Sequence, residues 1–539
     1  MPLSRKKTSR KLVKQLPSLC CLLSLKLAAA PLPIEQTISL DAHQSHSWSI
    51  ALQSGDYLSG KFSATNKLEQ ATLDDPNGKR IKQLLLSPSQ GQSLHLVAQQ
   101  SGNYQLTLTN AAVPNQLTLK LRKPALAMQT AQTTLASQTL QELIAQYVKA
   151  GNTELFWQQI SHIGSPLIEA IAPHRIDEPK GSSLVTFLWR GAKHNVKLLG
   201  GPGHEHHTFK QIEDSDIWYL SLSLPNNSLF SYQIAPDVPT LAESGRAQRV
   251  AILSTAQRDP FNPNTWHFSE RQDKYTSKSI LRLAAAPAEP WLTPVATHQG
   301  TLSQSQISSK ILNNSRDVYL YRSANPAADS SLPLVIFFDA ESYLQQAQTP
   351  QLLDNLVNAK KIPALNAVFI SNPSAQSRAT ELACNPQFSS FLAKELLPWL
   401  AQQNITAPAK QTILAGSSYG GLTAACTATL YPELFGGVLS LSGSFWWGPK
   451  MDPSRQHQPE WLTQQLALKP TSTVRWYLSA GLFEETWILP PNRRLKSLLD
   501  AKGYQSQLSE IAGGHDMLAW RTQLPEGLIY LLDPQQPQR

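Results

Sequence analysis

Cysteine is scarce in this chain of 539 residues, which contains only four. Cys20 and Cys21 lie in an N-terminal segment that we expect to be removed, so Cys384 and Cys426 would remain. One pair of cysteines excludes a fold built mainly on disulfides. The two thiols could pair in an oxidising compartment, but we expect them to be small, buried, unpaired residues.

Several functional signatures are also missing. The sequence has no glycine loop of the phosphate-binding type and no zinc-ligand pattern, so no resident cofactor or metal is expected. Residues 1–30 contain no acid and seven Lys or Arg; without them the chain has 40 basic and 38 acidic side chains. The net charge therefore falls from +9 to +2, which argues against nucleic acid as a partner.

Residues 1–30 are predicted to be a signal peptide. A basic region precedes the apolar run Leu16–Leu27, and the small residues Ala28–Ala30 follow it. The run is too short for an ordinary membrane-spanning helix, and no later stretch is long enough. A lipid anchor on Cys20 or Cys21 is an alternative that the preceding residues fit poorly. We expect a periplasmic or secreted protein without a membrane span once the signal is removed.

Two β-rich regions follow the predicted signal. Residues 33–123 hold short alternating strands and turns, which predict a small β-sandwich accessory domain resembling the bacterial pre-peptidase C-terminal type. Residues 140–290 begin with a helical pattern at Thr139–Val148 and continue with strands from Ser182 to about Val250. A histidine cluster around Glu205 lies among these strands, but its spacing matches no familiar ligand motif, so a polar loop is predicted there.

Residues 295–539 differ in character and predict an α/β domain. Five apolar runs alternate with segments long enough for helices: Leu332–Ala340, Asn366–Ser371, Gln411–Ser417, Gly436–Ser444 and Val474–Gly481. Continuous apolar strands of this kind predict a mostly parallel sheet covered by helices on both faces. Functional residues of such sheets lie beyond the carboxyl ends of the strands.

The stretch Gln411–Gly421, QTILAGSSYGG, contains the candidate nucleophile. Of its two adjacent serines, only Ser418 has glycine at both −2 and +2, whereas Ser417 does not. This G-x-S-x-G spacing is typical of a nucleophile elbow between a strand and a helix. The pattern is short enough to occur by chance, so partner residues are needed to support it.

A nucleophilic serine needs a base and a group that orients the base. In hydrolases with this elbow the chain order is Ser, acid, His, and His515 in EIAGGHDMLAW has the required place. Glu484 follows the last apolar run and is the favoured acid, with Glu485 as the alternative. Asp516 is adjacent to His515, and a neighbour in sequence rarely reaches round to orient the adjacent imidazole. The expected oxyanion hole uses the backbone N–H of Tyr419 and that of Ala340 or Glu341. Together these groups predict acyl transfer, most simply ester hydrolysis.

Longer motifs resemble the enterochelin (enterobactin) esterases, α/β-hydrolases that cut the serine trilactone of catecholate siderophores. The motifs are LVIFFDAESY, SRATELACNPQF, AGSSYGGLTAA, PELFGGVLSLSGSFWW, AGLFEE and GGHDMLAWR, and upstream FWQQISHIGSPLIE, VTFLWRG and RDPFNPNTW. The resemblance covers roughly residues 150–535. The better-known members of that family are largely cytoplasmic. This chain differs from them in its predicted export and in the added β-sandwich.

By position, this resemblance implies that Ser418 is the nucleophile, His515 the base and Glu484 the acid, although some siderophore esterases manage with a Ser/His pair. It implies that Arg378 meets an anionic tris-catecholate and that Trp446, Trp447 and Trp520 stack on catechol rings, unless these tryptophans only fill the core. The implied substrate is a ferric catecholate siderophore, with iron present only as part of it. Two alternatives stay open, an esterase for feruloyl or other aryl and acyl esters and a non-catalytic siderophore-binding protein.

Overall fold

The computed structural model describes residues 32–85, 88–124, 137–149, 151–171, 181–202, 206–241, 245–267, 274–294, 299–324, 331–449, 460–484 and 486–533. The predicted signal peptide, His204, Glu205 and Glu485 lie outside these residues. The chain forms two compact units. The first covers the chain up to Lys123 except residues 57–59 and 95–97, and the second contains the remainder.

The first unit is all-β and is built on one long strand. Its strands are β1 (Ile34–Leu40), β2 (Ser45–Leu52), β3 (Tyr57–Asp74), β4 (Arg80–Gln83), β5 (Ser89–Val97), β6 (Gly102–Asn110) and β7 (Asn115–Arg122). Hydrogen bonds join them in the order β1-β7-β3-β6-β2, with β4 and β5 also paired to β3. All seven belong to one sheet because β3, at 18 residues, is long enough to pair with different neighbours along its length.

The second unit begins with two helices and two antiparallel four-stranded sheets. The helices are α1 (Gln138–Tyr147) and α2 (Glu154–Ile163). One sheet has the order β11-β12-β9-β8, with β8 (Leu167–Ala170), β9 (Ser182–Arg190), β11 (Lys210–Gln211) and β12 (Ile217–Pro225). The other has the order β10-β13-β15-β14, with β10 (Val196–Gly200), β13 (Leu229–Pro236), β14 (Thr265–Trp266) and β15 (Lys278–Arg282). Strands were predicted to about Val250, but β13 ends at Pro236 and α3 (Gly245–Thr255) is helical; β14 and β15 follow α3 and complete the second sheet.

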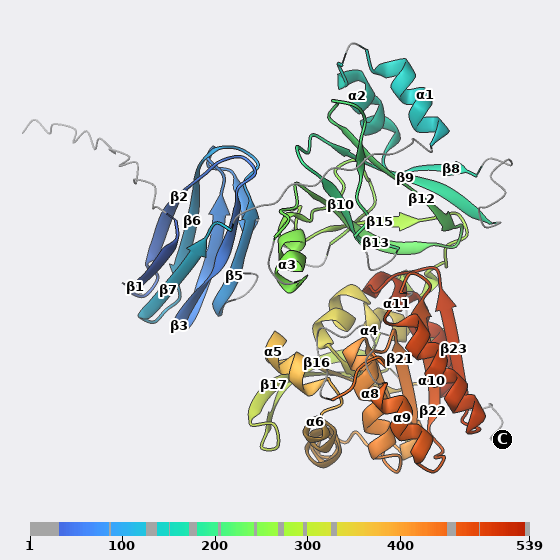
Figure 1. Ribbon diagram of the computed structural model, residues 1–539. Helices are drawn as coiled ribbons and strands as arrows, with labels where there is room; N and C mark the ends of the chain where they lie inside the picture. The colour runs from blue at the N-terminus through green and yellow to red at the C-terminus, as the bar shows by residue number, and fades with distance from the viewer. Residues whose placement is uncertain are drawn as a thin grey trace, which may run out of the picture. The chain divides into compact units, whose positions relative to one another are not determined.

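The largest sheet has eight strands, in the order β16-β17-β19-β18-β20-β21-β22-β23. Figure 1 labels β16 and β17 toward one edge and β21, β22 and β23 toward the other. Its strands are β16 (Thr301–Ser309), β17 (Asn314–Arg322), β18 (Leu334–Phe338), β19 (Asn366–Ile370), β20 (Thr412–Ser417), β21 (Gly437–Leu441), β22 (Arg475–Gly481) and β23 (Ser506–Ile511). The strands from β19 to β23 in this order run parallel, and β16 and β17 add an antiparallel pair at one edge.

Helices cover both faces of this sheet. The bounds are α4 (Thr349–Asn358), α5 (Ala375–Glu381), α6 (Pro386–Phe391), α7 (Leu397–Gln402), α8 (Tyr419–Leu430), α9 (Trp461–Leu468), α10 (Leu489–Ala501) and α11 (Met517–Leu532). Adjacent residues of β18 belong to different cores: Ile336 shares a core with residues of α6, α8 and α10, and Phe337 shares one with residues of α4 and α11. The predicted α/β fold is therefore confirmed. Among the described residues no helix is long and apolar enough to cross a bilayer.

Cys384 and Cys426 form a disulfide, so the expectation of unpaired thiols was wrong. Both are buried, as expected, but their Cα atoms lie 5.5 Å apart, a separation typical of disulfides. Sequence could not show this approach, because 42 positions separate the two residues. The bond ties the segment that follows α5 to the middle of α8.

Candidate active site

Ser418 occupies a strained turn between β20 and α8. Its φ of +57° and ψ of −120° lie in a region that residues other than glycine rarely adopt. Hydrogen bonds fix the turn on both sides: the Ser418 N–H donates to Leu441 O at 2.9 Å, and its carbonyl accepts from Leu422 and Ser444 at 3.1 Å. The Ser444 Oγ also lies 3.3 Å from the Ser418 Oγ. Gly416 is needed because a Cβ there would lie 2.5 Å from the backbone of Gly420.

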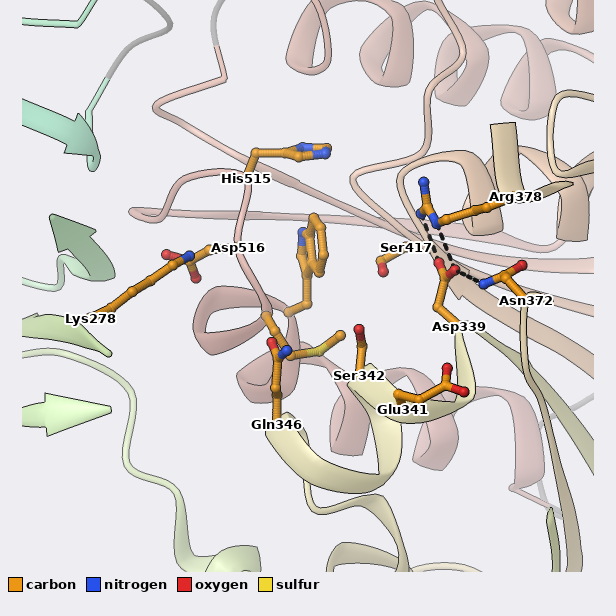
Figure 2. A pocket seen from close by; sticks show the side chains of 12 residues that line it. Lys278, Asp339, Glu341, Ser342, Gln346, Asn372, Arg378, Ser417, His515 and Asp516 are labelled. Carbon is orange, nitrogen blue, oxygen red and sulfur yellow. Dashed lines mark hydrogen bonds and ion pairs between the residues drawn. The ribbon is translucent and has the colours of Figure 1, made fainter. Parts of the chain in front are cut away.

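His515 and Glu484 are in direct contact at the neighbouring strand ends. His515 lies on the loop between β23 and α11, and Glu484 follows β22. The Nδ1 of His515 meets Glu484 Oε1, and because an ionised carboxylate can only accept, Nδ1 carries the proton. Nε2 is then the nitrogen that can accept a proton from a serine. Figure 2 shows His515 at the cavity described below.

Glu484 is almost completely buried, at 1% exposure, and its second oxygen is also hydrogen-bonded. Oε2 accepts from the Gly481 N–H at 2.6 Å and from the Ser442 Oγ at 2.6 Å. Sequence inspection did not single out Ser442, which lies 42 positions from Glu484. The carboxylate is thus held at both oxygens, with one of them directed at the imidazole.

Asp516, the sequence neighbour of His515, has other partners than the imidazole. Its Oδ2 accepts from the N–H of Ser231 at 2.7 Å and from the Ser231 Oγ at 2.9 Å, both buried contacts. Its Oδ1 caps α11 by accepting from the Ala519 N–H at 2.9 Å. Because Ser231 belongs to β13, the upstream β region holds the loop that carries His515.

The two N–H groups expected in the oxyanion hole both lie at helix starts. Tyr419 is the first residue of α8, ahead of the first hydrogen bond of that helix, which Leu422 donates to Ser418. Ala340 lies two residues after the end of β18, and the first hydrogen bond of the turn that contains it runs from Ser342 N to Asp339 O at 3.0 Å. N–H groups at such positions lack an intrahelical acceptor, so they can serve a developing oxyanion.

A cavity of about 390 Å³ opens at these strand ends (Figure 2). It is lined by Lys278, Asp339, Glu341, Ser342, Gln346, Asn372, Arg378, Ser417, His515, Asp516, Met517 and Trp520. The positive charges of Lys278 and Arg378 are thus offset by three acidic side chains in the same lining. Lys278 comes from β15, so the upstream β region contributes to the lining.

Arg378 on α5 is already paired with a carboxylate. Its Nε and Nη2 donate to Asp339 at 2.6 and 2.8 Å, and Asn372 donates to the same carboxylate at 2.6 Å. Burial lowers the pKa of the Arg378 guanidinium, but the hydrogen bonds and charge of Asp339 outweigh burial and leave the pKa raised. Arg378 is therefore a fixed cation, and Asp339 partly neutralises its attraction for an anionic ligand.

The three tryptophans have different surroundings. Trp520 is nearly buried and lines the cavity, and its ring meets the His515 ring edge to face with centroids 4.9 Å apart. Trp446 lies between Tyr419 and Trp487, at centroid distances of 6.3 and 6.1 Å. Trp447 packs against the core and against Trp461. Trp520 and Trp446 thus adjoin the candidate site, whereas Trp447 faces the interior.

The upstream histidine cluster is described only in part. His207 Nε2 donates to Pro202 O at 2.8 Å, within the segment between β10 and β11. Across the described part of the chain, no group of three or more His, Cys, Asp or Glu side chains is arranged to hold a metal ion.

Two protein families match the chain. The family described as "Enterochelin esterase, N-terminal" matches residues 184–292, and the one described as "Putative esterase" matches residues 309–531. The first match covers most of the upstream β region. The second covers most of the eight-stranded sheet and includes Ser418, Glu484 and His515.

Individual relatives are similar over the same part of the chain. An iron(III) enterobactin esterase of Escherichia coli O6:H1 is 31% identical over 65% of this chain and 91% of its own length. An iron(III) salmochelin esterase of the same organism is 30% identical over 69% of this chain and 92% of its own length. The crystal structure of the Shigella flexneri enterobactin esterase, obtained in the presence of enterobactin, covers 72% of this chain and 100% of its own. It has a TM-score of 0.55 and 27% identity.

Proposed function

The chain belongs to the enterobactin esterase family, and we propose that it is an exported serine esterase that hydrolyses the ester bonds of ferric catecholate siderophores. The observation that carries this proposal is the His515–Glu484 contact, together with the strained Ser418 turn that follows a strand of the same sheet. Iron enters as part of the substrate, and its release would follow from cleavage of the ligand. No resident cofactor is proposed.

In the proposed reaction, the Ser418 Oγ attacks the ester carbonyl carbon while His515 Nε2 takes the hydroxyl proton. Glu484 holds the Nδ1–H tautomer and stabilises the imidazolium that forms. The N–H groups of Tyr419 and Ala340 receive the oxyanion, and the departing alcohol takes the proton from His515. Water then repeats the sequence on the acyl-enzyme, which releases the acid and restores Ser418.

Substrate recognition in this proposal uses the groups around the cavity. Arg378 presents a cation held in place by Asp339, and Trp520 and Trp446 offer aromatic faces on which catechol rings can stack. The relatives named for iron(III) enterobactin and iron(III) salmochelin support a catecholate substrate.

Substrate preference tests this assignment against an esterase for plant-type aryl esters. We expect kcat/KM for ferric enterobactin to exceed that for methyl ferulate by about 10-fold or more, because only the siderophore uses the cation and both aromatic faces. Initial rates measured by chromatography with the purified protein provide the comparison. Faster turnover of methyl ferulate would favour the aryl-ester alternative.

Export is proposed from the N-terminal sequence and receives support from the disulfide. Disulfides persist in the periplasm and outside the cell but are rare in a reducing cytosol. Cell fractionation is expected to place the protein in the periplasm or medium, with an N-terminus near residue 30 and Cys384 resistant to alkylation until reduced. A cytoplasmic protein that retains Met1 and in which Cys384 and Cys426 are freely alkylated without reduction would contradict export.

A further inference from the structure

Ser442 lies directly after β21 in an unusual backbone position. Its φ is +48°, it is 1% exposed, and its N–H donates to Ser479 O at 2.7 Å. Its Oγ lies 2.6 Å from Glu484 Oε2 and 2.8 Å from Trp520 Nε1. A strained serine is therefore held between the candidate acid and a tryptophan that contacts the candidate base.

The direction of these hydrogen bonds follows from the groups themselves. An indole N–H can only donate, so Ser442 Oγ accepts from Trp520. The single hydroxyl proton of Ser442 is then directed to Glu484, whose ionised carboxylate can only accept. This chain of hydrogen bonds runs from Trp520 through Ser442 to Oε2 of Glu484. The other oxygen of Glu484, Oε1, remains available to accept from His515.

We propose that Ser442 is a positioning residue that fixes the Glu484 carboxylate for its contact with His515. This inference rests on the proposed esterase function. Glu484 Oε2 has two donors, the Ser442 hydroxyl and the Gly481 N–H, and without Ser442 only the backbone donor would hold that oxygen. The carboxylate could then rotate, and the His515 ring would lose its fixed orientation.

The surrounding contacts support a role in positioning. Two residues further on, Ser444 contacts Ser418, so one turn after β21 touches both ends of the candidate triad. The buried Asn492 of α10 donates to the Gly443 carbonyl at 2.9 Å and holds this turn. Ser442 is 1% exposed and its hydroxyl is engaged by Glu484 and Trp520, so it acts on the reaction through these neighbours.

The test replaces the hydroxyl in two ways, Ser442→Ala and Ser442→Gly. Alanine keeps the Cβ and the positive φ of the wild type and removes only the hydroxyl, whereas glycine removes the hydroxyl and also releases the strain. An effect of the lost hydrogen bond therefore appears in both variants, and an effect of released strain appears only in the glycine variant. We expect kcat for a simple aryl ester to fall about 10- to 100-fold in both, with KM nearly unchanged.

Ser440→Ala is the matched control. Ser440 is buried two residues earlier in β21, and its Oγ has no hydrogen-bond partner among the described residues. The control is expected to keep kcat within about 2-fold, because no interaction with the triad is removed. Thermal unfolding of all variants shows which of them are folded.

A double-mutant cycle separates positioning from a general structural effect. If Ser442 acts through Glu484, adding Ser442→Gly to Glu484→Gln should cost less than about 2-fold further in kcat. A multiplicative loss would overturn the inference, as would wild-type kcat in a folded Ser442→Gly variant. An inactive wild type would overturn the proposed function and this inference together, whereas an active wild type with active Ser442 variants would overturn this inference alone.

Discussion

Replacing Ser418 with alanine is expected to lower kcat for ester hydrolysis by at least about 10⁴-fold, because no other group can form the acyl-enzyme. The elbow holds the Ser418 backbone by hydrogen bonds from three segments, so the variant should fold. Alanine removes only the hydroxyl, and the strained φ of +57° is present in both proteins. Stopped assays with an aryl ester measure the activity of the variant, and thermal unfolding shows whether it is folded.

Ser417→Ala is the comparison for this experiment. Ser417 is the adjacent serine, the last residue of β20, 2% exposed and without the positive φ of Ser418. This variant should still react covalently with a fluorophosphonate, whereas Ser418→Ala should not. If labelling disappears in Ser417→Ala and persists in Ser418→Ala, Ser417 and not Ser418 is the nucleophile.

Glu484→Gln is expected to lower kcat by about 10³- to 10⁴-fold with little change in KM. The Oε2 position receives two donors, the Ser442 hydroxyl and the Gly481 N–H, so the amide oxygen of glutamine should occupy it. The amide NH₂ would then face His515 Nδ1 and require that nitrogen to accept. The proton moves to Nε2, which can no longer act as the base for Ser418.

Glu485→Gln provides the control for Glu484→Gln, since the two acids are adjacent and were both candidates from sequence. It should keep kcat within about 3-fold of the wild type. A large loss in Glu485→Gln with an active Glu484→Gln would move the acid to Glu485. Full activity in both variants would indicate a Ser/His pair without a carboxylate.

The sequence predicted most of the central sheet because its buried strands are continuous apolar runs. β18, β19 and β20 each fall within a predicted run. β16 was missed because TLSQSQISS is largely polar and exposed, as an edge strand can be. Its antiparallel partner β17 alternates in burial and was not recognised either.

The candidate triad was accessible from sequence because a known chain order relates the three residue types. The contacts that hold the triad in place could not be predicted from the sequence. Ser231 meets Asp516 across 285 positions, and Ser442 meets Trp520 across 78 positions. Such pairs follow from how β13, β21 and α11 pack, and no local pattern in a single sequence reports that packing. The Cys384–Cys426 bond was missed for the same reason.

The central claim is that Ser418 cleaves the ester bonds of a ferric catecholate siderophore. It is tested most directly by incubating ferric enterobactin with equal amounts of wild type and Ser418→Ala and resolving the products by chromatography. The account predicts linear and monomeric dihydroxybenzoyl-serine products from the wild type and intact substrate from the variant. Identical product profiles from both proteins would contradict it.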